Sequence, residues 1–215
     1  MSKNYPHPLL AKEGWLFIII AIITTIIMGF IANIYLTMLC LVVTIFIIQF
    51  FRDPPREIPD IANAILSPAD GKIILIAPVM DPYQNKEAIK ISIFMNIFNV
   101  HSNRIPVDAQ VEQMEYIRGK FINADFDKAS TDNERNAIVL KLTNGTKITV
   151  VQIAGLIARR ILCYIKIGQK VQKGERYGFI RFGSRVDLYI DPNCRLNVIL
   201  GQKVSATTSI IATYN

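Results

Sequence analysis

The chain has 215 residues, enough for one compact domain and a membrane segment, and 51% of them are hydrophobic. Its formal net charge is +7, but the basic residues are scattered and form no nucleic-acid motif, so a nucleic-acid-binding protein is not expected. On a membrane-attached protein, this charge favours contact with anionic lipid headgroups. The three cysteines, Cys40, Cys163 and Cys194, lack metal-ligand spacing and are odd in number, so we expect reduced thiols and no metal site.

Two uncharged apolar runs follow the N-terminal tail. They cover residues 15–31 and 34–51, with Ala32-Asn33 between them. A spanning helix needs about 20 apolar residues, with a lower limit near 17, so both runs are just long enough. The pattern predicts a helical hairpin that either crosses the bilayer or enters one leaflet and returns. A cleaved signal peptide is not expected, because a second run stands where a cleavage site would follow.

The charges around the apolar runs predict their orientation. Basic residues occur on both sides, at Lys3, Lys12, Arg52 and Arg56. Because basic flanks stay in the cytoplasm, both ends of the hairpin are expected there. We therefore expect residues 1–52 to form a tail and hairpin in the cell (inner) membrane, and residues 53–215 to form a domain on the cytoplasmic side.

The remainder of the chain has the texture of a mainly β domain. Short β-like runs occur at residues 71–76, 89–94, 107–116, 137–142 and 147–154. Asn144-Gly145 is typical of a hairpin turn between the last two runs. Residues 158–166 fit either a short helix or a strand. Regular short strands with turns between them predict a β-sandwich or barrel.

One segment suggests a binding module rather than an enzyme. Residues 166–175 are similar to part of the biotinyl and lipoyl carrier domains, and Asp127-Lys128-Ala129 resembles a lipoyl-lysine site. A carrier lysine, however, needs a tight hairpin between two strands, and residues 125–127 lie in a polar loop. The carrier hypothesis therefore stands as an alternative only.

A Gly-Ser bond inside a strand-like run is the most informative local feature. Gly183-Ser184 lies between Phe179-Ile180 and the run 186–190, both rich in strand-forming residues. Gly183 lacks a Cβ atom, which leaves its carbonyl open to attack. The hydroxyl of Ser184 can attack that carbonyl and convert the amide into an ester. An ordinary serine at a β-bulge is the alternative.

The surrounding residues resemble the processing site of the short-form phosphatidylserine decarboxylases, a pyruvoyl-dependent family. The resemblance begins with the RFGSRVDLYI stretch at residues 181–190 and covers roughly residues 8–200. Further segments resemble the family in the same order: FFRDPPR (50–56), SPADGK (67–72), FNVHSNRIP (98–106) and, more weakly, NERN (133–136). The family resemblance also implies a compact, mainly β domain that is barrel-sandwich-like.

The resemblance implies a self-processing enzyme. The precursor is cleaved between Gly183 and Ser184 into a large chain, 1–183, and a small chain, 184–215, and Ser184 becomes a covalent pyruvoyl group. That group forms a Schiff base with phosphatidylserine and acts as an electron sink, so phosphatidylethanolamine and carbon dioxide are produced without a metal or a dissociable cofactor. The expected partners are phosphatidylserine and the two chains of one precursor, and a homo-oligomer is compatible with the sequence.

His101 and Asp70 are candidates for acid–base chemistry, with a structural histidine and a solvated turn aspartate as the alternatives. Only His7 and His101 are histidines, and His101 is the one in the predicted β domain, so it is the natural proton donor. The family's matching aspartate supports base catalysis during self-cleavage. Long-form members have a second histidine where this chain has Arg104, which cannot act as a base, so either His101 takes both roles or Asp70 acts more directly. Arg104 and Arg185 are candidate substrate-binding residues, with a plain salt bridge as the alternative for Arg104.

One further enzyme class uses the same residues. A membrane-anchored serine hydrolase would employ Ser184, His101 and Asp70 as a triad. It would keep an intact chain, whereas the pyruvoyl enzyme would not.

Overall fold

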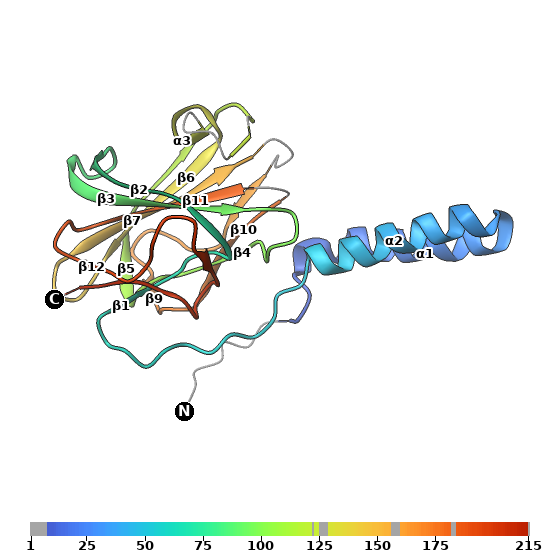
Figure 1. Ribbon diagram of the computed structural model, residues 1–215, viewed down its shortest axis with the longest axis horizontal. Helices are drawn as coiled ribbons and strands as arrows, with labels where there is room; N and C mark the ends of the chain where they lie inside the picture. The colour runs from blue at the N-terminus through green and yellow to red at the C-terminus, as the bar shows by residue number, and fades with distance from the viewer. Residues whose placement is uncertain (1–7, 122, 125–128, 156–159, 182–183, 215) are drawn as a thin grey trace. The chain divides into compact units, whose positions relative to one another are not determined.

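The computed structural model describes residues 8–121, 123–124, 129–155, 160–181 and 184–214. The chain divides into two compact units, one of them Pro6–Pro55 and the other containing Arg56–Asn215. The division falls immediately after Pro54-Pro55, where the sequence changes from apolar runs to β-like runs. The two units are described separately below (Figure 1).

The first unit is a helical hairpin. A short 3-10 turn, η1 (Lys12–Gly14), leads into α1 (Trp15–Ile31), and α2 (Ile34–Phe50) returns beside it. The turn at Ala32-Asn33 is stable because the Asn33 side chain accepts a hydrogen bond from the Leu36 amide at 3.0 Å, which caps the first turn of α2. The two helices have nearly the bounds that the apolar runs predict.

Threonine hydroxyls join the two helices inside the hairpin. The Thr44 hydroxyl donates to the Ala21 carbonyl at 3.2 Å and lies 2.9 Å from the Thr25 hydroxyl. Nearer the turn, the Thr37 hydroxyl donates to the Met28 carbonyl at 3.1 Å. Such hydrogen bonds hold apolar helices together where no hydrophobic driving force acts between them, as in a bilayer.

Backbone hydrogen bonds join the two ends of the hairpin. The Ala11 amide donates to the Phe51 carbonyl at 2.8 Å, and the Asp53 amide donates to the Leu9 carbonyl at 2.7 Å. Gly14 is required here, since a Cβ atom on it would lie 2.2 Å from the Phe51 ring. Both ends of the hairpin therefore emerge together.

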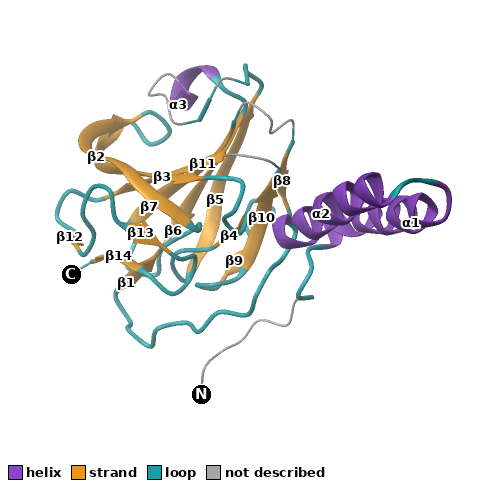
Figure 2. Cartoon of the chain, turned by 45° about the vertical axis from the view of Figure 1, so that its right-hand side comes forward, coloured by secondary structure: helices purple, strands orange, loops and turns teal. Residues whose placement is uncertain are grey.

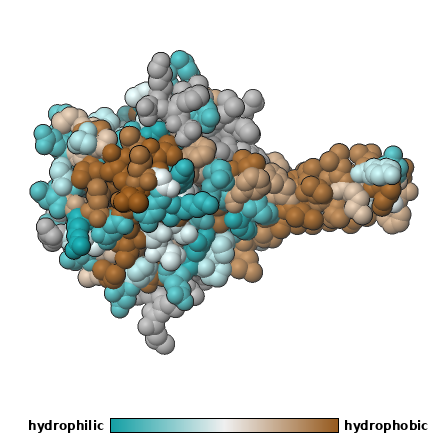
Figure 3. Space-filling view, in the orientation of Figure 1, coloured by the Kyte–Doolittle hydropathy of each residue, from teal (hydrophilic) through white to brown (hydrophobic). Residues whose placement is uncertain are grey.

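The outer surface of the hairpin is apolar along its length (Figure 3). Large side chains that a soluble protein would bury are open, with Phe30 86% and Tyr35 84% exposed. By length and composition, Lys12–Ile31 qualifies as a helix able to cross a membrane, and Ile34–Phe50 is a shorter apolar helix. This surface fits a lipid environment better than water.

The second unit is mainly β, as the sequence predicts. Its largest sheet is antiparallel, strongly curled and eight-stranded, in the order β13-β2-β3-β11-β7-β6-β5-β9 (Figure 2). Those strands are β2 (Gly71–Asp81), β3 (Lys86–Met95), β5 (Ala109–Ile117), β6 (Arg135–Lys141), β7 (Lys147–Ala154), β9 (Lys170–Val171), β11 (Ser184–Ile190) and β13 (Lys203–Val204).

Two three-stranded sheets complete the unit, in the orders β1-β14-β12 and β4-β10-β8. Their strands are β1 (Ala64–Leu66), β4 (Ser102–Arg104), β8 (Ile161–Cys163), β10 (Arg176–Ile180), β12 (Arg195–Leu196) and β14 (Ile210–Thr213), and a short helix, α3 (Ala129–Asp132), precedes β6.

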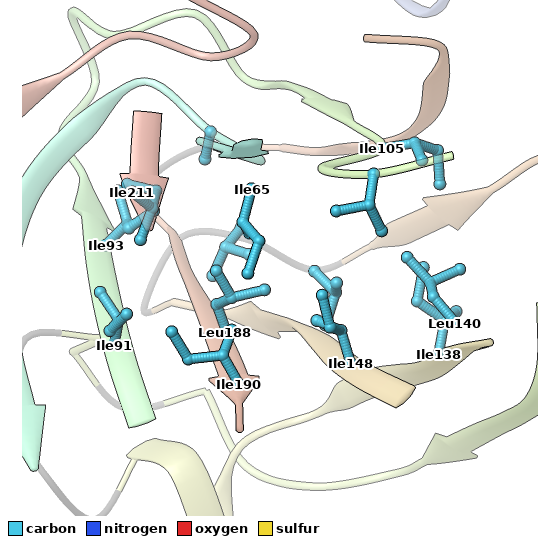
Figure 4. Packing of buried hydrophobic residues seen from close by; sticks show 14 of the residues in the cluster. Ile65, Ile91, Ile93, Ile105, Ile138, Leu140, Ile148, Leu188, Ile190 and Ile211 are labelled. Atoms are coloured by element: carbon cyan, nitrogen blue, oxygen red, sulfur yellow. The ribbon is translucent and has the colours of Figure 1, made fainter. Parts of the chain in front are cut away.

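The main core lies on the concave side of the large sheet. Alternate residues of neighbouring strands point inward, so Ile91 and Ile93 of β3 and Leu188 and Ile190 of β11 belong to one cluster with residues of β6 and β7 (Figure 4). The opposite face of the sheet carries a smaller apolar cluster around Tyr189 and a group of buried charges. The central strand β11 is consequently covered on both faces.

The sequence-predicted strands are found, with differences in length. The turn at Asn144-Gly145 is confirmed: Lys141 of β6 pairs with Lys147 of β7, and Gly145 has a φ of 86°. For residues 158–166 the structure decides for a strand at Ile161–Cys163, and residues 156–159 lie outside the described ranges. Residues 125–128, which include the lipoyl-like Lys128, also lie outside them.

Candidate active site

Ser184 is the first residue of β11, the strand at the centre of the large sheet. It pairs with Met95 of β3 on one side and with Ala154 of β7 on the other. Its side chain is fully buried, and its hydroxyl donates to the Met95 sulfur at 3.2 Å. A thioether is a weak acceptor, so the hydroxyl is held in place without being strongly engaged. Gly183, the other half of the predicted cleavage site, lies outside the described residues.

His101 is fully buried immediately before β4. Its Nδ1 atom lies 3.0 Å from the Asn99 carbonyl oxygen. Because a carbonyl only accepts hydrogen bonds, Nδ1 must carry a proton, which leaves Nε2 as the nitrogen that can gain or lose one. The His101 carbonyl also accepts from the Ile180 amide at 3.3 Å, which fixes the residue against β10. The ring therefore has a defined tautomer and position.

Asp70 lies in the loop between β1 and β2. One carboxylate oxygen forms a 2.7 Å ion pair with Arg56, and the other accepts from the Ala206 amide at 2.7 Å. The same loop is bonded to β4, since the Arg104 amide donates to the Pro68 carbonyl at 2.9 Å. The fold thus joins two sequence-predicted segments, the Asp70 loop and the strand that follows His101.

The two candidate substrate-binding arginines occupy different environments. Arg104 is 3% exposed on β4, and its guanidinium lies 3.4 Å from the Gly174 carbonyl oxygen. Arg185 is fully buried on the opposite face of β11 from Ser184, because neighbouring residues of a strand alternate in direction. Its guanidinium donates to Asp187 and to the Ser92 hydroxyl, both at 2.6 Å.

Asp187 is the centre of this buried charged cluster. Its second carboxylate oxygen lies 3.1 Å from the Lys90 ammonium and accepts from the Ser130 hydroxyl at 2.9 Å. The cluster joins β11 to β3 and to α3. Since a buried carboxylate is tolerated only with such partners, the cluster fixes the strand that begins at Ser184.

Sequence reasoning assigned no role to three buried amides that are connected to Ser184 through the Met95 sulfur: Asn103 on β4, Gln152 on β7 and Asn136 on β6. The Gln152 side chain donates to Asn103 at 2.8 Å and accepts from Asn136 at 3.1 Å. The nitrogen of the Asn103 amide lies 3.9 Å from the Met95 sulfur, the atom that also accepts from Ser184. A glutamine inside the apolar run 150–153 was the available sequence signal.

Two other ionisable side chains near these amides are poor proton acceptors. Burial raises the pKa of the Cys163 thiol, an effect that hydrogen bonds, including one with Asn136, only partly oppose. Burial likewise raises the pKa of Tyr177 well above its usual value. Both groups therefore stay neutral near pH 7, and His101 remains the better candidate for proton transfer.

The described part of the chain offers no site for a metal ion. Among the residues that the structure describes, no three or more His, Cys, Asp or Glu side chains are grouped to hold one.

The structure is that of a mainly β domain with a buried serine, Ser184, at the start of its central strand. The comparisons specify its relationship: the sequence model of the family described as phosphatidylserine decarboxylase matches residues 43–212. The chain belongs to this family. A phosphatidylserine decarboxylase proenzyme of Cupriavidus taiwanensis is 55% identical over 210 residues, covering 97% of both chains. Those of Ralstonia nicotianae and Ralstonia pickettii are 54% and 55% identical over 212 residues, covering 99% of both chains.

Proposed function

We infer that this chain is the proenzyme of a decarboxylase that converts phosphatidylserine to phosphatidylethanolamine and carbon dioxide. The observation that carries the inference is the family relationship over nearly the whole chain, at 54–55% identity, with Ser184 inside the matched region. The hydrolase and carrier alternatives have no comparable support.

We propose that Ser184 forms the reactive group by self-cleavage. The Ser184 hydroxyl loses its proton to His101 and attacks the Gly183 carbonyl carbon, so the amide bond breaks as an ester forms. Elimination then leaves a carboxylate on Gly183 and dehydroalanine at position 184. Water hydrolyses this residue to a pyruvoyl group and ammonia. The tautomer of His101 supports its role as base, because Nε2 can accept the proton.

The surroundings of Ser184 fit a pyruvoyl group. The group keeps the α, β and carbonyl carbons of serine and loses the hydroxyl oxygen, so it needs no more room than the serine has beside Met95. Its carbonyl supplies an electrophile for the substrate amine and a sink for the electrons left when carbon dioxide departs. His101 then returns a proton to the substrate carbon, and Arg104 binds the substrate carboxylate or phosphate. The ion pair of Arg185 with Asp187 supports a positioning role for that arginine.

The helical hairpin is proposed to hold the enzyme at its substrate. Its apolar surface fits the bilayer, where phosphatidylserine resides, and its joined ends are flanked by Lys12, Arg52 and Arg56. Basic flanks favour the cytoplasmic side of the cell membrane. A spanning hairpin and a re-entrant one would both provide this anchor.

Intact mass under denaturing conditions tests the proposal. The expected result is two chains, 1–183 and 184–215, with the small one blocked at its N-terminus and reducible by borohydride. Ser184→Ala should remain a single chain without decarboxylase activity. An active protein that stays full-length and reacts with a fluorophosphonate would instead indicate a serine hydrolase, and an intact inactive chain without a carbonyl would indicate a carrier.

A further inference from the structure

Three buried amide side chains form a continuous hydrogen-bonded network that ends at the Met95 sulfur, the atom that also accepts from the Ser184 hydroxyl. Asn103 and Gln152 are fully buried and Asn136 is 4% exposed. The hydrogen-bonded amides run from Asn136 on β6 through Gln152 on β7 to Asn103 on β4, so they join the large sheet to the three-stranded sheet β4-β10-β8. Burying three amides costs free energy unless their hydrogen bonds are made, so the arrangement calls for a reason beyond packing.

A main-chain carbonyl determines which end of each of the three side-chain amides is the NH₂ group and which is the oxygen. The Gln152 nitrogen lies 3.3 Å from the Leu162 carbonyl oxygen. Because that oxygen can only accept, the NH₂ end of Gln152 must face it, and this nitrogen also donates to the oxygen of Asn103. The NH₂ end of Asn103 must then face the other way, towards Met95.

Asn103 consequently directs a weakly engaged N–H donor at the same sulfur atom that the Ser184 hydroxyl contacts. Its nitrogen lies 3.9 Å from the Met95 sulfur, at the outer limit of a hydrogen bond to sulfur, and the Ser184 hydroxyl lies 3.2 Å from the same atom. A thioether makes weak use of both donors. An oxygen that gains negative charge at Ser184 would be a much better partner for the Asn103 amide.

We propose that the Asn103 side chain donates a hydrogen bond to the Ser184 oxygen as that oxygen loses its proton in self-cleavage. The proposal rests on the proposed function: the proton passes to His101 and the oxygen then bonds to the Gly183 carbonyl carbon. A preorganised donor in a buried site stabilises developing charge without having to reorient. Gln152 and Asn136 act through Asn103 and are positioning residues.

Gly178 of β10 leaves the space that the Gln152 side chain occupies in this amide network. It pairs with Asn103 on one side and Cys163 on the other. A Cβ atom at this position would lie 2.4 Å from the Gln152 nitrogen and 2.5 Å from the Leu162 carbonyl oxygen. Gly178→Ala would therefore push Gln152 away from the carbonyl that orients it.

The test follows self-cleavage rather than decarboxylation. Full-length wild type, Asn103→Asp, Gln152→Glu and Asn144→Asp are synthesised in a short radioactive pulse, and the loss of full-length chain is timed on gels. The control Asn144→Asp keeps the exposed turn, where only the side-chain oxygen accepts from the Thr146 amide. At pH 7 we expect Asn103→Asp to cleave about 10²–10³-fold more slowly, as for loss of one oxyanion donor. Gln152→Glu should be about tenfold slower and Asn144→Asp unchanged.

A pH series separates donation from packing. The carboxyl group introduced by Asn103→Asp regains an O–H donor when it is protonated, so the cleavage rate of this variant relative to wild type should rise as the pH falls from about 7 to about 5. A variant that cleaves at the wild-type rate, or one that is folded and equally slow at every pH, overturns the proposal.

Folding of the variants is checked by thermal melting in a Ser184→Ala background. If Asn103→Asp does not fold, the cleavage rates of Gln152→Glu and Gly178→Ala test the proposal instead. Wild-type cleavage rates in both of these variants would overturn it. A wild-type chain that never cleaves would refute the proposed function instead.

Discussion

The carboxylate of Asp70 and the guanidinium of Arg56 lie 2.7 Å apart, which connects the segment that precedes β1 to the loop between β1 and β2. The other carboxylate oxygen of Asp70 is taken by the Ala206 amide. Both oxygens of Asp70 are thus held by donors, one of them charged. A carboxylate bound in this way is held in one position.

The charge of Asp70 is expected to matter for self-cleavage. Asp70→Asn keeps an oxygen for the Ala206 amide but loses the charge and the ion pair with Arg56, so cleavage should slow at least about tenfold, the lower range for acid–base support. The cleavage rate is measured from the masses of the chains present at set times after a short pulse of synthesis. The matched control is Asp108→Asn, an exposed position that keeps its bond from the Lys173 amide. Normal cleavage of Asp70→Asn would make Asp70 a structural residue.

His101 is predicted to serve the decarboxylation itself. His101→Ala removes both the proposed base for self-cleavage and the proton donor, so cleavage should slow and carbon dioxide release per molecule that does cleave should fall by about 10²–10⁴. The measurement uses headgroup-labelled phosphatidylserine and normalises activity to the amount of small chain, which separates turnover from processing. His7→Ala, in the N-terminal tail, is the control and should behave as wild type. If His101→Ala cleaves and turns over normally, our assignment is wrong.

The buried cluster around Asp187 should contribute far more to the free energy of unfolding than an exposed ion pair does. Asp187→Asn leaves the cations of Arg185 and Lys90 buried without their anion, and breaking such a group costs about 3–5 kcal/mol. For a domain of this size, that lowers the melting temperature by on the order of 10 °C. The control Asp132→Asn breaks the pair with Lys120, whose side chain is 74% exposed, and should cost under about 1 kcal/mol.

Both variants are to be melted in a Ser184→Ala background, so that each sample contains one uncut chain. Equal melting temperatures for Asp187→Asn and Asp132→Asn would show that the buried cluster does not stabilise β11.

Local features of the fold were predictable from the sequence. The helices α1 and α2 follow from two uncharged runs, and the β6–β7 turn follows from Asn144-Gly145, since each depends on neighbouring residues only. The predicted runs 71–76 and 89–94 missed that β2 and β3 continue to a turn ending at Asn85, which has a φ of 51°. Solvent-exposed residues in these extensions hide the strand pattern.

The site was predictable only as a set of segments. Strand alternation alone would have placed Ser184 and Arg185 on opposite faces of β11, so that relationship could have been derived. The contact between Asn103 and Gln152 could not have been derived from the sequence, because it joins residues that are far apart along the chain and belong to two different sheets. Amides also carry no charge pattern that would mark them as functional.

The helical hairpin is expected to deliver the enzyme to its substrate without shaping the catalytic site. Deleting residues 1–51 should give a more soluble domain that still cleaves itself, because the Gly183-Ser184 bond and its proposed helpers belong to the β unit. Activity on phosphatidylserine in vesicles should fall because the local concentration at the membrane is lost. Activity on a water-soluble short-chain phosphatidylserine should fall much less.

The comparison must be made at fixed salt, since a basic domain can still be drawn to anionic vesicles and that attraction is screened as ionic strength rises. A useful control is Thr25→Val with Thr44→Val, which removes the hydroxyl contact between the two helices and keeps the apolar surface. This variant should remain on the membrane and keep most of its vesicle activity. Equal losses on the vesicle and soluble substrates after the deletion would mean that the hairpin contributes to the active site, because a simple anchor affects only the substrate that lies in the bilayer.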